Sequence, residues 1–174
     1  MPSSGPSGYW TQIGADIDGE ASFDTSGYAV AMSSDGTRIA IGAYYNDGNG
    51  TSSGHVRVYE IKNGSWVQLG ADIDGEAEGD QSGRSLAISS DGTRIAIGAP
   101  HNGGNGSSSG HVRVYEIKNG SWVQLGADID GEAEGDQSGE SVAMSSDGTR
   151  IAIGAYYNDG NGSKSGHVRV YEGM

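Results

Sequence analysis

The sequence contains no cysteine, only three prolines and one phenylalanine in 174 residues, and no long apolar run. Without cysteine there are no disulfides and no thiol chemistry, although this absence does not identify a compartment. No stretch reaches the roughly 18 apolar residues that a membrane-spanning helix needs, and no signal peptide is expected. Positive charge is scarce, with ten Lys and Arg against 23 Asp and Glu, a net charge of −13. This charge repels nucleic acid and anionic membranes, so neither is expected as a partner.

Glycine is abundant, at 32 residues, and it falls at fixed places in a 56-residue repeat. Trp10, Trp66 and Trp122 mark the period, and the segment 54–60 (GHVRVYE) returns unchanged at 110–116 and 166–172. A repeat of this size is typical of solenoids and propellers, and it excludes an ordinary single-copy enzyme fold. The second and third copies are nearly identical, which indicates either a recent duplication or an engineered sequence.

Within each copy the hydrophobic pattern has a period of two, and no stretch has the pattern of a capped amphipathic helix. The second copy predicts four short strands, at 85–89, 94–98, 111–116 and 122–126. Asp-Gly between the first two and Asn-Gly between the last two predict two-residue hairpin turns, because both central positions require positive φ. The link 100–110 is expected to be an exposed, mobile loop. The unit is therefore a four-stranded antiparallel meander, which indicates an all-β propeller built from three blades.

At this point the residues resemble a known family. In the second copy, Ser82-Gly83, Asp91-Gly92, Gly98-Ala99-Pro100 and the segment 110–115 together resemble the FG-GAP repeat of integrin-α-type β-propellers. The resemblance is strongest to the divergent form in large acidic repeat proteins of marine microbes, and it covers nearly everything after residue 8. It implies a parent family that works outside the cell or at its surface.

Two departures from the family pattern matter. Serine (Ser26, Ser82 and Ser138) replaces the phenylalanine of Phe-Gly, and Gly-Ala-Pro survives only in the second copy. The family's calcium loop lies between the first two strands, where this chain has only the short segment 89–94 with a single carboxylate. That calcium site is therefore not expected here.

The positions of the strands in the chain predict a split blade. Residues 1–8 are interpreted as a linker or cloning remnant, 9–18 as a fourth strand, 19–74 and 75–130 as complete blades, and 131–172 as the first three strands of a last blade.

Three blades do not close a ring, because propellers have about 4–8. The fourth strand of one copy is therefore expected to complete the last blade of another, head to tail. A homodimer with six blades is favoured, and a homotrimer with nine is the alternative. The predicted interface residues are Trp10, Ile13, Val168, Val170 and Tyr171.

Large residues of neighbouring blades are expected to interdigitate, and small ones to crowd the axis. In the second copy the large set is Ile95, Ile97, Val112, Val114, Val123 and Leu125, and the small set is Ala87, Ala96 and Gly98.

The acidic linkers between blades are the strongest candidate for a metal site. Carboxylates at alternating positions around glycines suit Ca²⁺, although their order matches no EF-hand loop. The Ca²⁺ candidates are Asp72, Asp74, Glu76, Asp80, Asp128, Asp130, Glu132 and Asp136. The alternative is that Asp24, Asp80 and Asp136 accept backbone N–H groups and hold the crossing between blades. The repeated histidines His55, His111 and His167 are expected to form structural hydrogen bonds and to lie too far apart to share a metal.

No catalytic residue and no cofactor other than Ca²⁺ is predicted, because a repeated array lacks the convergence of different groups that an active site needs. The favoured function is a non-catalytic scaffold or binding module that assembles with itself, of natural or engineered origin. The alternatives are an extracellular adhesion module that depends on Ca²⁺ or carbohydrate and, more remotely, a propeller hydrolase.

Overall fold

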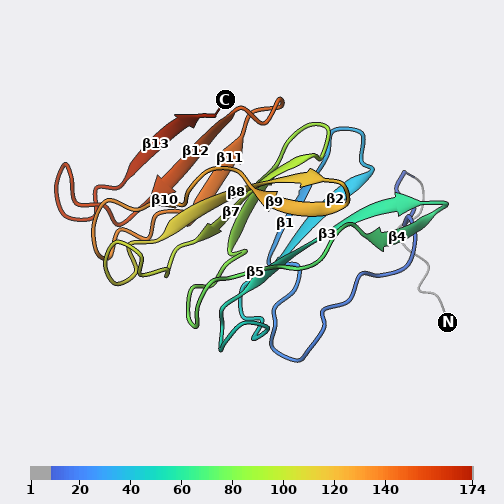
Figure 1. The fold of residues 1–174 in the computed structure, drawn as a ribbon, viewed down its shortest axis with the longest axis horizontal. Coiled ribbons are helices and arrows are strands. Elements are labelled where there is room, and N and C mark those ends of the chain that lie inside the picture. The colour runs from blue at the N-terminus through green and yellow to red at the C-terminus, as the bar shows by residue number, and fades with distance from the viewer. Residues whose placement is uncertain (1–8, 174) are drawn as a thin grey trace.

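The computed structural model describes residues 9–173, so the linker predicted at residues 1–8 lies outside the described residues. In this range the protein is all-β, with thirteen strands and no helix. The strands form three antiparallel sheets, one for each repeat, which follow one another from the blue to the red end of the chain in Figure 1. The prediction of an all-β fold with three blade-like units is confirmed.

Each complete blade has four consecutive strands and a fifth, two-residue strand that pairs with the third. The first blade comprises β1 (Ala29–Met32), β2 (Arg38–Ala43), β3 (His55–Lys62), β4 (Ser65–Gln68) and β5 (Ile73–Asp74). The second comprises β6 (Ser85–Ile88), β7 (Arg94–Ala99), β8 (His111–Lys118), β9 (Ser121–Gln124) and β10 (Ile129–Asp130). The third has only β11 (Ser141–Met144), β12 (Arg150–Ala155) and β13 (His167–Glu172).

One of the two predicted hairpin turns differs from the expectation. Asn63 and Gly64 have φ of 50° and 79°, the pair of positive values that a two-residue turn requires. The Asp-Gly turn is a longer loop, closed by a hydrogen bond from the Ser33 N–H to the Arg38 carbonyl, and only Gly36 has positive φ. The side chain of Asp35 explains the difference, because it accepts hydrogen bonds from the Ser33 hydroxyl and the Thr37 N–H and so folds the loop around itself.

The hydrophobic core lies between blades. One cluster joins the first two blades and contains Val56, Val58, Leu86, Ile95 and Ile97. A second cluster joins the second and third blades and contains Ala96, Val112, Ile151 and Ile153. The expected interdigitation is therefore present, with one correction: Val123 is 44% exposed, because alternation along β9 places it on the opposite face from Trp122, which packs against the core.

The two ends of the chain carry unpaired elements. Residues 9–18 form no strand in the single chain, and β13 has no strand on its outer side. The N-terminal segment instead lies against the first blade, where its Ile13 carbonyl accepts a hydrogen bond from Trp66 and its Asp18 carbonyl accepts one from Arg57. The prediction that residues 9–18 form a fourth strand is therefore not met within the single chain.

Candidate functional site

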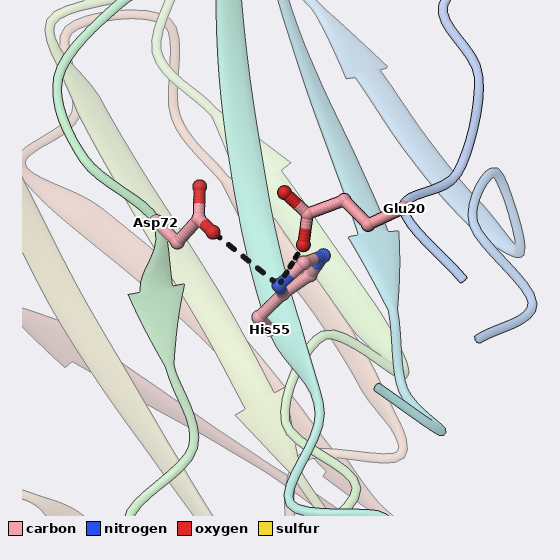
Figure 2. A group of neighbouring side chains, drawn as sticks. All are labelled: Glu20, His55 and Asp72. Carbon is pink, nitrogen blue, oxygen red and sulfur yellow. Dashed lines mark ion pairs between the residues drawn. The ribbon is translucent and has the colours of Figure 1, made fainter. Parts of the chain in front are cut away.

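A histidine and two carboxylates meet in the first blade, at the start of β3, and Figure 2 shows them converging. His55 is the first residue of β3, Glu20 lies in the segment before β1, and Asp72 lies just before β5. The His55 Nδ1 lies 3.9 Å from Glu20 Oε2 and 3.8 Å from Asp72 Oδ2. The histidine itself is buried, whereas both carboxylates are partly exposed. Because β3 pairs with β5, the sheet holds Asp72, which directly precedes β5, close to His55.

The second copy repeats this arrangement with tighter geometry. The Nδ1 of His111 lies 3.7 Å from both Glu76 Oε2 and Asp128 Oδ2. Arg113 binds Glu76 through its other oxygen and both oxygens of Asp128, at 2.9 Å from its Nε to Oδ1 and 3.3 Å from its Nη2 to Oδ2. The His111 side chain is only 3% exposed, and its buried Nδ1 has no hydrogen-bond partner. Burial lowers the pKa of His111, and the charge of Asp128 opposes this shift. The expectation that these histidines make structural hydrogen bonds is therefore wrong for the Nδ1 of His111.

The third copy has the histidine and the glutamate but a different second carboxylate. His167 Nδ1 lies 3.6 Å from Glu132 Oε2, and Asp136 completes the group. The repeat position of Asp72 and Asp128 is also occupied by Asp16, 56 residues before Asp72. Asp16 is held by Gln12 Nε2 at 2.8 Å, as Asp72 is held by Gln68 at 2.6 Å.

The eight predicted Ca²⁺ ligands do not gather in one site. Within one linker, Asp72 faces His55 whereas Glu76 faces His111. Asp80 is buried and accepts hydrogen bonds from the Ala77 N–H and the Asn102 side chain. Its equivalent Asp136 accepts the same two kinds of hydrogen bond, from the Ala133 N–H and the Asn158 side chain. Asp74 and Asp130 are exposed. Asp128 and Glu132 belong to the histidine groups. The carboxylates of one linker therefore face the histidines of two successive blades.

A set of buried asparagines was not predicted from the sequence. Asn46, Asn102 and Asn158 lie in the long loops and are at most 7% exposed. Each donates to the equivalent aspartate of the preceding linker, at 2.8–2.9 Å. The loops were expected to be simply exposed, but their amide side chains fold inward to satisfy a buried carboxylate. The signal was present in the sequence, because the asparagine recurs at the same place in all three copies.

Residues at the same position of the repeat differ in burial according to the blade in which they lie. Val56 and Val112 are fully buried between blades, whereas their equivalent Val168 is 66% exposed and Val170 is 68% exposed. On the first blade, Val30 is 60% exposed, although its equivalent Leu86 is 9% exposed. Both ends of the blade array therefore present an apolar face that is covered at each internal junction.

The predicted interface residues divide into two groups. Trp10, Ile13, Val168 and Val170 are between 63% and 87% exposed, as an interface in a larger assembly requires. Tyr171 differs, because its side chain packs against the core between the second and third blades. Alternation along β13 places Tyr171 on the inner face and its neighbour Val170 on the outer face.

The tryptophans show a similar contrast. Trp66 lies against Gly14, and Trp122 lies against Gly70, with the indole ring within 3.0 Å of where a Cβ would be. The equivalent Gly126 has no atom within 4 Å of that position. It lines instead a groove of about 420 Å³ with Leu125, Ala127, Ile129 and Tyr171.

Comparison with known proteins supports the fold. A family model described as the FG-GAP repeat matches residues 15–59, 71–115 and 127–171. No curated protein matches the chain significantly. Among solved structures, the chain is similar to the hydrazine synthase of Kuenenia stuttgartiensis, with a TM-score of 0.54 and 13% identity over 91% of this chain and 36% of that one. It is also similar to the periplasmic gluconolactonase PpgL of Pseudomonas aeruginosa, with a TM-score of 0.53 and 16% identity over 83% and 38% of the two chains.

The chain thus spans less than two fifths of either structure, and at such identities the likeness concerns the fold alone. No helix that could cross a membrane occurs among residues 9–173.

Proposed function

The chain belongs to the FG-GAP repeat family, and from this premise we propose that it is a non-catalytic β-propeller scaffold that assembles head to tail into a closed ring. Two copies would provide six blades, which is the favoured assembly, and three copies would provide nine. The proposal requires that the N-terminal segment of one copy add a fourth strand to the third blade of the next. An engineered origin, suggested by the near-identity of the copies, is compatible with this role.

The groove beside Gly126 carries the proposal. At the two internal junctions, the position next to the equivalent glycine is filled by a tryptophan of the following blade. The blade that follows Gly126 is the third, whose fourth strand would come from another copy, and Trp10 of that strand is 87% exposed in the single chain. An indole in an apolar groove buries a large area, and its N–H needs an acceptor there. The Leu125 carbonyl is the equivalent of the Leu69 carbonyl that accepts from Trp122.

The backbone of the last strand supports the same partner. In the first blade, β3 pairs Tyr59 with Gln68 and Val56 with Ile73. Shifted by the repeat, these pairs become Tyr171 with Gln12 and Val168 with Ile17 of a second copy. The added strand would cover the unpaired edge of β13, which otherwise offers a template for uncontrolled association. The apolar face of Val168 and Val170 would then pack against Val30 and Met32 of the same second copy.

The non-catalytic part of the proposal is supported by the repetition of the polar clusters. Each group of histidine and carboxylates recurs with the same residue types, so the described residues provide no single place where different catalytic groups converge. The two enzymes with a similar fold are too distant in sequence to transfer an activity.

The solution mass tests the assembly. Light scattering on the eluting chain is expected to give about twice the chain mass of 17.8 kDa for six blades, or about three times for nine. A stable mass of one chain at all concentrations would overturn the proposal. A second readout is the emission of Trp10 in a variant with Trp66→Phe and Trp122→Phe, which is expected to shift to the blue as the concentration rises.

A further inference from the structure

We propose that each blade binds one divalent transition-metal ion, of the Zn²⁺ class, and that the site of the third blade is completed by Asp16 of a second copy. The internal sites are Glu20, His55 and Asp72, and Glu76, His111 and Asp128. The junction site combines Glu132 and His167 of one chain with Asp16 of the next. The two internal sites stand on this chain alone, whereas the third rests on the proposed assembly.

The geometry of the second copy points to a cation. Its His111 Nδ1 lies 3.7 Å from one oxygen of each carboxylate, too far for a hydrogen bond to either. Zn²⁺ binds imidazole nitrogen and carboxylate oxygen at about 2.0–2.2 Å, so two such ligands in tetrahedral geometry lie roughly 3.4–3.6 Å apart. The observed separations need only a small contraction to reach that value. The three ligand atoms all lie within 4.8 Å of one another, so a single ion could bind them together.

The orphaned nitrogen is the second, independent observation. A buried polar atom without a partner is costly, and natural structures avoid it unless water, a ligand or an ion satisfies it. The Nδ1 of His111 is such an atom, in a side chain that is 3% exposed and directed at the two carboxylates. A metal ion between them would satisfy the nitrogen and would balance the acidic charge that Arg113 only partly neutralises.

The ligand chemistry favours Zn²⁺ over Ca²⁺. Calcium takes six to eight oxygen ligands, whereas this site offers one nitrogen and two carboxylates around a buried imidazole. Imidazole with carboxylate suits the late first-row divalent metals, and three protein ligands leave a fourth position for water. A glutamine also holds the aspartate from outside, as Gln124 does for Asp128 at 2.7 Å, which fixes the ligand in advance.

Asp16 is prepared for the same role at the chain junction. Its carboxylate is held by Gln12 as the other two aspartates are held by Gln68 and Gln124. The expected pairing of a second copy's residues 17–18 with His167 and Val168 would place Asp16 beside the His167 imidazole, as β5 places Asp72 beside His55. A metal ion at this position would link the two chains, so its binding would strengthen the assembly.

Titration with Zn²⁺ alone tests the inference. The full chain, freed of metal by a chelator, is titrated by calorimetry, and its mass is followed by light scattering with and without Zn²⁺. Three ions per chain are expected in the assembled ring, and Zn²⁺ is expected to lower the concentration at which the ring dissociates. Tetrahedral Co²⁺ in place of Zn²⁺ is expected to show its visible absorption, which three independent surface carboxylates would not produce.

Two variants separate the sites. Asp16→Asn changes an exposed residue, so the fold of the chain should persist. It is expected to bind two ions per chain and to lose the effect of Zn²⁺ on assembly. His111→Gln is also expected to bind two ions, but to keep that effect, because the junction site is intact. Three ions bound by Asp16→Asn would overturn the junction site.

The remaining outcomes are equally distinct. A ring that binds no Zn²⁺ would overturn the metal sites while the assembly stands. A single chain that binds two ions would overturn the assembly and the junction site, while the two internal sites stand. Displacement of Zn²⁺ by a modest excess of Ca²⁺ would overturn the assignment of the metal class.

Discussion

The indole Nε1 of Trp122 donates a hydrogen bond of 2.8 Å to the carbonyl oxygen of Leu69. Trp122 lies in β9, the last long strand of the second blade, whereas Leu69 directly follows β4, the corresponding strand of the first. The bond therefore joins the outer parts of consecutive blades. The same bond joins Trp66 to the Ile13 carbonyl at 2.9 Å. One tryptophan per repeat thus binds the equivalent carbonyl 53 residues before it, and in the proposed assembly Trp10 would bind the Leu125 carbonyl of another copy.

The first prediction concerns Trp10 itself. Trp10→Ala is expected to reduce the solution mass to that of one chain, because the indole no longer fills the groove beside Gly126 of the neighbour. The thermal midpoint of the separated chain should not change, since Trp10 is exposed there. Trp66→Ala is the matched control: it removes the same contact inside the chain and is expected to cost about 1–2 kcal/mol of unfolding free energy. An unchanged oligomer mass for Trp10→Ala would contradict the proposed junction.

The second prediction compares two valines at the same repeat position. Val58 is 1% exposed and Val170 is 68% exposed. Val58→Asp is expected to cost at least about 1.5–3 kcal/mol through lost apolar burial, with a further cost for the buried charge. Val170→Asp should leave the chain folded and prevent its assembly. Circular dichroism reports the fold and light scattering the mass; equal loss of fold in both variants would mean that Val170 is buried within a single chain.

Much of the fold could be predicted from the sequence, because the repeat multiplies each weak signal by three. The alternation in β7 and β8 and the Asn-Gly turn at Asn119 are local features, and the structure follows them. The prediction of a two-residue turn at Asp-Gly was wrong because it considered backbone preference alone. The Asp35 carboxylate competes for the loop donors, and a side chain that satisfies them favours a longer loop.

The candidate site was less predictable because its residues are distant in sequence. Asp72 and Glu76 are close together in the acidic linker, and the sequence alone suggested that they share a site. The linker crosses from one blade to the next, so that they face different histidines. The burial of Asn102 and the missing partner of the His111 Nδ1 depend on packing, which no local pattern reports.

The third prediction concerns the buried pair of Asn102 and Asp80. The amide donates to Asp80 Oδ2 at 2.9 Å, and both side chains are at most 6% exposed. Asn102→Ala leaves the buried carboxylate with the Ala77 N–H, so a loss of about 1–3 kcal/mol in unfolding free energy is expected. Urea denaturation measures it. Ser90→Ala, which removes an exposed hydroxyl contact, is the control and should change stability by less than about 0.5 kcal/mol. Equal effects of the two changes would mean that water replaces the amide at no cost.

The last prediction concerns acid stability. The Ser33 hydroxyl, the Thr37 N–H and the Thr37 hydroxyl donate to Asp35 and lower the pKa of its carboxyl from 3.8 to about 2. Because this pKa is lower in the folded than in the unfolded chain, the ionised group stabilises the fold. That contribution is complete above about pH 4 and is lost as the pH falls toward 2. The free energy of unfolding should therefore decrease across this range.

Ser33→Ala removes the largest of these contributions and is expected to raise the pKa of Asp35 toward its ordinary value. NMR titration of the carboxyl carbons measures it, with Asp35→Asn to assign the signal among the three repeats. Asp147, whose pKa is also lowered to about 2, keeps its own Ser145 and serves as a reference within the same molecule. The shift should appear at Asp35 and leave Asp147 unchanged. If both carboxyls still titrate near 2, the N–H and the hydroxyl of Thr37 hold the pKa down, and the serine hydroxyl contributes nothing to acid stability.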